Sequence, residues 1–110
     1  MFVPFASHAV VDIRKLTDYC LSPRHEQGKH KARLFAVVLG ITEEDAAQLR
    51  VALLTAVRSE QADIGRRDVY GQRYLVDFQL EWRGAKARIR SCWMIEHGSS
   101  VPRLTPCYVL

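Results

Sequence analysis

Hydrophobic and polar residues recur with a helical period in the first half of the chain and with a period of two in the second half. Three segments of the first half place apolar side chains on one helical face: 14–20, 29–39 and 42–59. Gly40 is a C-terminal stop signal for the second segment. Thr42, with Asp45 three residues later, forms a variant capping box that opens the third. We therefore expect two or three N-terminal helices.

From residue 68 onward, apolar and polar residues alternate, which is typical of strands with one buried face. One face carries the apolar set Tyr74, Val76, Phe78, Leu80 and Trp82, followed by Ala87, Ile89, Ser91, Trp93 and Ile95. Arg83-Gly84 and residues 97–100 form turns, and Arg103–Val109 forms a further strand. The pattern predicts an α+β fold with the helices packed on one face of a twisted antiparallel sheet of about four strands. The other face of the sheet is expected to be partly open.

A chain of 110 residues with 48% hydrophobic residues suits one domain, which we divide into an arm or strand (1–13), a helical part (14–60) and a sheet (68–110). Its apolar runs are too short to span a membrane. Met1–Val11 lacks the basic start and cleavage site of a signal peptide. The three cysteines are widely spaced and odd in number, so we expect buried free thiols in a reducing, cytoplasmic compartment.

The net charge of +4 is concentrated in two segments, 14–33 and 83–103. We expect these segments to meet on one surface and to bind a polyanion; the alternative is two solvated faces that never meet. Arg88 and Arg90 are two residues apart and therefore point to the same face of a strand, where they suit phosphate oxygens. The alternative for these arginines is cross-strand pairing with Asp77 or Glu81.

The segment 29–33 places Lys29 and Arg33 on one helical face, beside His30, a natural proton carrier near neutral pH. His30 is equally consistent with an ordinary surface residue. The sequence has no metal-ligand pair, no clustered carboxylates, no phosphate-binding glycine loop and no G-x-S-x-G elbow. We therefore expect no metal and no cofactor, and a hydrolase here would use basic and hydroxyl groups alone.

Several short motifs together resemble an uncharacterised bacterial domain family with the pattern KLxxYxLxPxHxxGxxKAxxF … YGxxYxV … TxWxI … PxLxTxY. They are Lys15–Tyr19, Leu21–Pro23, His25, Gly28–Arg33, Phe35, Tyr70–Tyr74, Arg90–Ile95, Pro102–Thr105 and Tyr108. That family occurs as a stand-alone protein and at the C-termini of polymorphic and contact-dependent toxins. It is similar to the barnase–EndoU–colicin–RelE group of metal-independent ribonuclease toxins. One departure is Ser91 where the family has Thr.

The resemblance implies RNA cleavage through the ribose 2′-hydroxyl, with tRNA or mRNA as substrate and an acidic antitoxin or immunity protein as partner. His30 or Lys31 would act as base or acid, and the neighbouring cations Lys29 and Arg33 would favour the neutral form of Lys31. Phosphate would be held by Arg90 and Arg103, and substrate also by Arg88. Thr105 and Tyr108 would add hydroxyl contacts or acid function, provided that a bulge at Pro106 brings them to one face. Trp93 is expected to pack in the core.

Two other functional classes fit the same residues. The first is a non-catalytic basic module that docks an acidic protein or nucleic acid, which needs the arginines but not His30. The second is a toxin partner or an inert remnant whose charges only keep it soluble. Turnover of RNA separates the enzyme from the binding module, whereas salt-dependent RNA binding is common to both.

Overall fold

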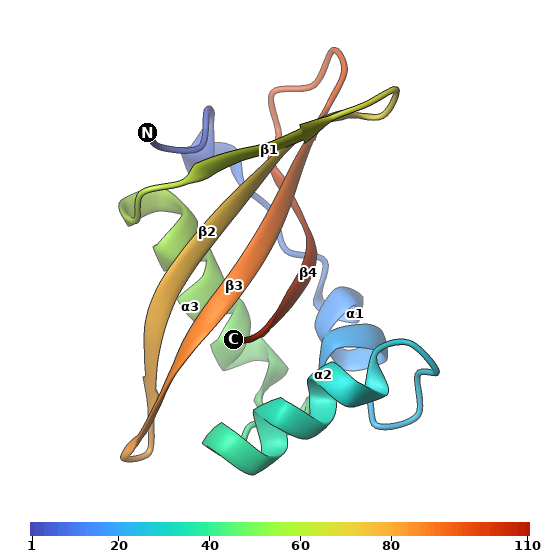
Figure 1. The fold of residues 1–110 in the computed structure, drawn as a ribbon, viewed down its shortest axis with the longest axis vertical. Coiled ribbons are helices and arrows are strands. Elements are labelled where there is room, and N and C mark those ends of the chain that lie inside the picture. Colours follow the sequence, from blue (N-terminus) through green and yellow to red (C-terminus); the bar gives the residue numbers. More distant parts are fainter.

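The computed structural model describes residues 1–110, with the helices first and a four-stranded sheet after them (Figure 1). The helical part comprises α1 (Ile13–Lys15) continued by η2 (Leu16–Cys20), α2 (Lys29–Leu34) continued by η3 (Phe35–Leu39), and η4 (Glu43–Asp45) followed by α3 (Ala46–Ser59). The strands are β1 (Asp63–Arg67), β2 (Gly71–Trp82), β3 (Ala85–Glu96) and β4 (Arg103–Val109). They pair in the order β1-β2-β3-β4, always antiparallel. The α+β prediction is confirmed.

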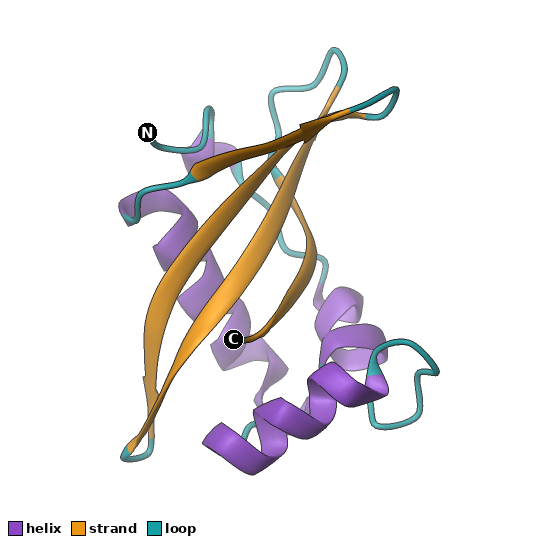
Figure 2. Ribbon diagram, viewed as in Figure 1, coloured by secondary structure: helices purple, strands orange, loops and turns teal.

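The helices lie on one side of the strongly twisted sheet, and the opposite side of β2 and β3 has no helix over it (Figure 2). Helix α3 crosses behind β2 and β3, whereas α1 and α2 lie beyond the lower part of β4 (Figure 1). Because no helix covers the opposite side, it is the surface on which polar strand residues can act, and we call it the exposed face of the sheet.

No helix combines the length and the apolar character that crossing a membrane requires.

The predicted helix signals are confirmed. Gly40 adopts the left-handed conformation (φ 72°) that glycine tolerates without a Cβ penalty, and it ends η3. Thr42 and Asp45 form the capping box, in which the Thr42 N–H donates to the Asp45 carboxylate at 3.0 Å. The predicted apolar stripe of α3 is fully buried: Ala46, Leu49, Leu53, Ala56 and Val57.

Trp93 lies in the centre of the core, as predicted, and is completely buried. Its indole N–H donates to the Ser91 hydroxyl at 2.9 Å, and that hydroxyl donates to the Val76 carbonyl at 2.8 Å. The hydroxyl at the position where the resembled family has Thr is thus a structural link inside the core. It does not reach the exposed face of the sheet.

The start of the sheet differs from the predicted residue 68, whereas residues 1–13 form the predicted arm. The sheet begins at Asp63, because β1 forms an edge strand that pairs with β2. The N-terminal arm contributes one parallel bridge, between Val10 and Arg103, and no full strand. All three cysteines are free, but only Cys20 and Cys107 are buried; Cys92 is half-buried on the exposed face of β3.

The predicted irregularity in the last strand is present. Leu104 pairs with Trp93 and Cys107 with Ser91, so β4 holds one residue more than β3 between these two pairs. The bulge falls at Thr105 and Pro106 and reverses the alternation. As a result Arg103 and Tyr108 both lie on the exposed face, as an irregularity at Pro106 would allow.

Candidate functional site

A row of three side chains crosses the exposed face of the sheet. Arg90 in the middle strand β3 is paired in register with Asp77 on β2 and with Tyr108 on β4. The Arg90 guanidinium donates two hydrogen bonds to the Asp77 carboxylate, from Nε to Oδ1 and from Nη2 to Oδ2, both at 2.9 Å. Such a bidentate pair fixes the plane of the guanidinium. The cross-strand alternative for Arg90 is therefore what the structure shows, while Arg88 has no acidic partner.

The charges of this pair stabilise each other. Hydrogen bonding to Arg90 lowers the pKa of Asp77, with burial opposing the shift and the charges of Arg90 and Arg88 adding to it. Asp77 in turn raises the pKa of Arg90 by hydrogen bonding and charge, and Tyr108 adds to this effect. Arg90 is therefore a permanent cation held beside the Tyr108 side chain.

Lys31 reaches the same place from helix α2. Its ammonium Nζ lies 5.6 Å from the centre of the Tyr108 ring and 5.5 Å from the centre of the Tyr19 ring, within cation–π range of both. Nζ also donates to the Tyr19 hydroxyl at 3.4 Å. Lys31 belongs to the first basic segment and Arg90 to the second. The two segments thus approach each other at Tyr108, and we call Tyr19, Lys31, Asp77, Arg90 and Tyr108 the Lys31 cluster.

The turn between η2 and α2 holds Tyr19 in position. His25 packs edge-on against Tyr19, with ring centres 4.7 Å apart. The backbone N–H groups of Gln27 and Gly28 donate to His25 Nδ1 at 3.1 and 2.9 Å, which fixes the imidazole. Gly28 packs so closely on Tyr19 that a Cβ there would lie 2.3 Å from the Tyr19 carbonyl oxygen. The short loop therefore sets the distance between Tyr19 and Lys31.

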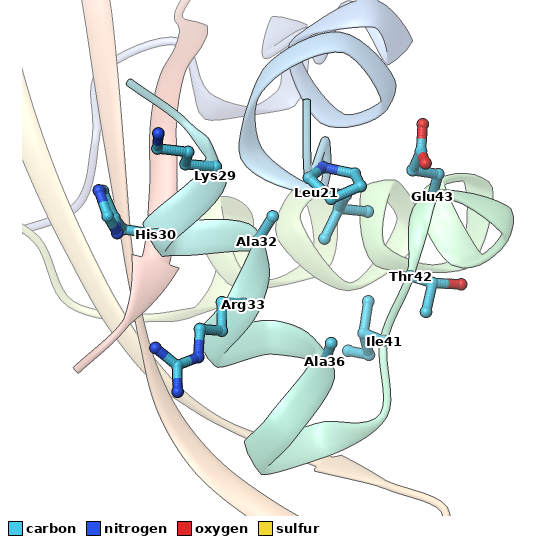
Figure 3. Close-up of a pocket in the computed structure, with 10 residues that line it drawn as sticks. Leu21, Lys29, His30, Ala32, Arg33, Ala36, Ile41, Thr42 and Glu43 are labelled. Carbon is cyan, nitrogen blue, oxygen red and sulfur yellow. The ribbon is translucent and has the colours of Figure 1, made fainter. Parts of the chain in front are cut away.

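Three predicted site residues line a different surface, a groove of about 580 Å³ along α2. Lys29, His30 and Arg33 lie at the rim of this groove, whose floor is apolar (Figure 3). His30 is exposed, and the Lys29 ammonium pairs with Glu26 at 3.3 Å. The groove does not include Lys31. Lys29 and Arg33 were expected to be the neighbours of the Lys31 ammonium. The structure places the rings of Tyr19 and Tyr108 beside it instead.

The remaining predicted residues are spread along β3 and β4. Arg103 pairs with Met94 in register and its guanidinium contacts Glu96 at 2.6 Å. Because Met94 is four residues from Arg90, Arg103 is displaced along the strand by roughly 13 Å. The Thr105 hydroxyl donates to the Cys92 carbonyl at 3.1 Å, so it is engaged in holding the bulge. Of the predicted residues, Lys31, Arg90 and Tyr108 come together at the exposed face of the sheet, and Arg88 lies on the same face of β3, where its charge acts on Asp77.

Tyr19 and Asp77 were not predicted as members of the site. Tyr19 falls in an amphipathic segment, where an aromatic side chain is typical of core packing. Asp77 appeared only as a partner that would neutralise an arginine. Tyr19 could have been found from one signal in the sequence. The first motif of the family that the chain resembles contains Tyr19, His25, Gly28 and Lys31 at fixed spacing.

We expect the Asp77–Arg90 pair to make a pH-dependent contribution to the free energy of unfolding. The folded pKa of Asp77 lies below its ordinary value of 3.8. The contribution is therefore complete above the unfolded pKa and is lost as pH falls through the folded pKa. We expect Asp77→Asn to lower the free energy of unfolding by about 1 kcal/mol at pH 7, after discounting for partial exposure. Denaturant unfolding at pH 7 and pH 2.5 measures this difference, and a gap that does not shrink in acid contradicts the assignment.

These observations define a class: an α+β domain with helices on one face of an antiparallel sheet and a Lys–Arg–Tyr cluster at the other face. Residues 3–110 match the family described as Domain of unknown function (DUF6883), and the chain belongs to this family. Among solved structures, a chain of the "Contact-dependent growth inhibition toxin - immunity protein complex from Klebsiella pneumoniae 342" is similar, with a TM-score of 0.70 and 15% identity. The similarity covers 96% of this chain and 96% of that chain, and it shows a shared fold. No curated protein matches the sequence.

Proposed function

We propose that the protein is a metal-independent endoribonuclease of the toxin class, which cleaves RNA through the ribose 2′-hydroxyl. The observation that carries the proposal is the convergence of Lys31, Arg90 and Tyr108 from α2, β3 and β4 at one place on the exposed face of the sheet. Phosphoryl transfer to a 2′-oxygen needs cations to stabilise the phosphorane and groups to move two protons. The Lys31 cluster supplies both kinds of group.

At phosphorus, the proposed reaction forms a bond to the 2′-oxygen and breaks the bond to the 5′-oxygen. A base removes the 2′-hydroxyl proton, the 2′-oxygen attacks phosphorus, and an acid protonates the departing 5′-oxygen. The products are a 2′,3′-cyclic phosphate and a 5′-hydroxyl. The only carboxylate of the cluster, Asp77, is engaged by Arg90 through both oxygens, which leaves no free carboxylate there to bind a metal.

Each member of the cluster has a distinct proposed role. Arg90, fixed by Asp77, holds a non-bridging phosphate oxygen with its remaining N–H groups. Lys31 stabilises the second charged oxygen and donates a proton to the leaving group. Tyr108, between the two cations, accepts the proton of the 2′-hydroxyl on its phenolate oxygen. His30 lies next in sequence to Lys31 but at the rim of the α2 groove, so it is proposed to contact RNA rather than to transfer a proton.

A protein partner forms part of the proposal. Seven basic side chains have no acidic partner in the structure: Lys15, Lys31, Arg33, Arg50, Arg58, Arg67 and Arg88. An acidic antitoxin or immunity protein that covers Lys31 and Arg88 would block the exposed face and be attracted by long-range charge. The similar solved structure is itself described as a toxin–immunity protein complex.

The test is incubation of purified protein with total tRNA and with mRNA in EDTA, beside Arg90→Ala and His30→Ala. We expect discrete products ending in 2′,3′-cyclic phosphate, lost in Arg90→Ala and retained in His30→Ala. Absence of cleavage by wild type would favour the second candidate, a non-catalytic basic module. The neutralised state of Arg90 is the observation that favours that candidate, because Asp77 already satisfies much of its charge.

A further inference from the structure

A second cavity, distinct from the α2 groove, adjoins the Lys31 cluster. It has a volume of about 480 Å³, within the range of small-molecule sites, and lies between η2 and the turn that holds His25 and Gln27. Tyr19 forms part of its wall and also accepts the hydrogen bond from Lys31. A group bound in this Tyr19 pocket would therefore be separated from Lys31 by a single aromatic ring.

The pocket has a fixed aromatic corner. The rings of Tyr19 and His25 lie at 74° to each other. Because His25 Nδ1 accepts two backbone N–H groups, the hydrogen-bond network assigns the proton of the neutral ring to Nε2. That nitrogen has no partner within the protein. A rigid imidazole with a free N–H is suited to stacking against a planar ligand and to donating one hydrogen bond.

The polar groups around this corner are available as well. The Gln27 side-chain amide makes no hydrogen bond within the protein, and Lys15 has no acidic partner. The Asp12 carboxylate, in contrast, is satisfied by Arg14. Asp18, the other carboxylate of the lining, accepts a hydrogen bond from the Thr17 hydroxyl and has no basic partner. The pocket thus offers an amide that both donates and accepts, one cation and one carboxylate without a charged partner, and an aromatic face. This combination matches the edge, the phosphate and the plane of a nucleotide.

We infer that the Tyr19 pocket binds an unstacked nucleobase of single-stranded RNA, next to the phosphate that is cleaved. This inference rests on the proposed ribonuclease function and adds its substrate class. Proteins read single-stranded RNA by stacking bases on aromatic side chains and by hydrogen bonding to their edges. A base inside a duplex is paired and stacked, so it cannot enter the pocket. The α2 groove has a single aromatic ring, that of His30 at its rim, and therefore lacks a corner formed by two rings.

The test uses a 2′-O-methyl RNA octamer with a central 2-aminopurine, which the proposed reaction cannot cleave. Its binding to wild type is measured by anisotropy and by quenching of the 2-aminopurine on stacking, beside the same sequence in a duplex. We expect tight binding and quenching for the single strand only. His25→Asn removes the ring but leaves a side-chain oxygen for the backbone N–H groups. It should weaken binding about 5- to 150-fold and abolish quenching.

Two further variants complete the design. Gln27→Ala should weaken binding several-fold without touching any internal hydrogen bond, and it carries the test if His25→Asn fails to fold. Arg58→Ala, which removes an unpaired surface cation of α3, is the matched control and should bind like wild type. Equal binding of duplex and single strand overturns the inference, and so does wild-type quenching by both pocket variants. The remaining explanations would be RNA binding through backbone charge alone, or a pocket that binds a side chain of a protein partner.

Cleavage of unmodified RNA is measured in parallel, so that the two proposals fail separately. Quenched, His25-dependent binding without cleavage by wild type would support the pocket and reject the ribonuclease. Cleavage by wild type that His25→Asn and Gln27→Ala leave unchanged would support the ribonuclease and reject the pocket.

Discussion

Replacing Lys31 by methionine is expected to lower the rate of RNA cleavage by about 10²- to 10³-fold, the size of effect seen when one preorganised electrostatic group is removed from a transition state. The ammonium of Lys31 is the only unpaired cation that contacts both Tyr19 and Tyr108. Methionine keeps the length of the side chain and packs well against aromatic rings, so the fold should persist. Single-turnover cleavage of tRNA, with thermal unfolding of the same sample, measures both quantities.

The matched controls lie on the same helix. Lys29→Met and Arg33→Met remove the same charge from the rim of the α2 groove and should cleave at close to the wild-type rate. Equal losses in all three variants would mean that α2 contributes only a general positive field, and Lys31 would have no special role. Lys31→Arg distinguishes charge from proton transfer, because guanidinium keeps the charge but does not release a proton near neutral pH.

The regular elements could be predicted because each has a complete buried face. The α3 stripe and the alternating residues of β2 and β3 all bury one side, and burial dictates the period. Strand β1 could not be predicted in the same way. Four of its five residues are exposed and it has a neighbour on one side only, so no hydrophobic period marks it. Its pairing with β2 is a tertiary contact, which composition does not encode.

The site was predictable only in part for a related reason. Alternation placed Arg90 on the exposed face, but its pairing with Asp77 rather than with Glu81 depends on strand register. The meeting of Lys31 with Tyr108 depends on how α2 lies against β4, and these residues are far apart in the sequence. The α2 periodicity places Lys29 and Arg33 on one face and Lys31 on the other, but it does not show which of these faces meets the sheet. Packing of the preceding loop decides that Lys31 is the residue that reaches Tyr108.

Gly28→Ala is expected to lower cleavage about 10²-fold even though every member of the Lys31 cluster is retained, because a displacement of about 1 Å is enough for such a loss. A Cβ at Gly28 would lie 2.3 Å from the Tyr19 carbonyl oxygen and 2.9 Å from a ring carbon of Tyr19. The backbone of Gly28 has φ −85°, which alanine adopts without strain. The substitution therefore acts by pushing η2 away from α2, at a cost of about 1–3 kcal/mol of stability.

Gly84→Ala provides a control with a comparable loss of stability at another place. Its φ of 89° is unfavourable for alanine, but the space around it is open and it lies in the β2–β3 turn. Cleavage is compared at a temperature where both variants are folded, and the ring signals of Tyr19 are followed by NMR. If Gly28→Ala shifts those signals and cleaves like Gly84→Ala, the position of Tyr19 is irrelevant to the reaction. If only Gly28→Ala loses activity, cleavage depends on the distance between Tyr19 and Lys31 that the loop sets.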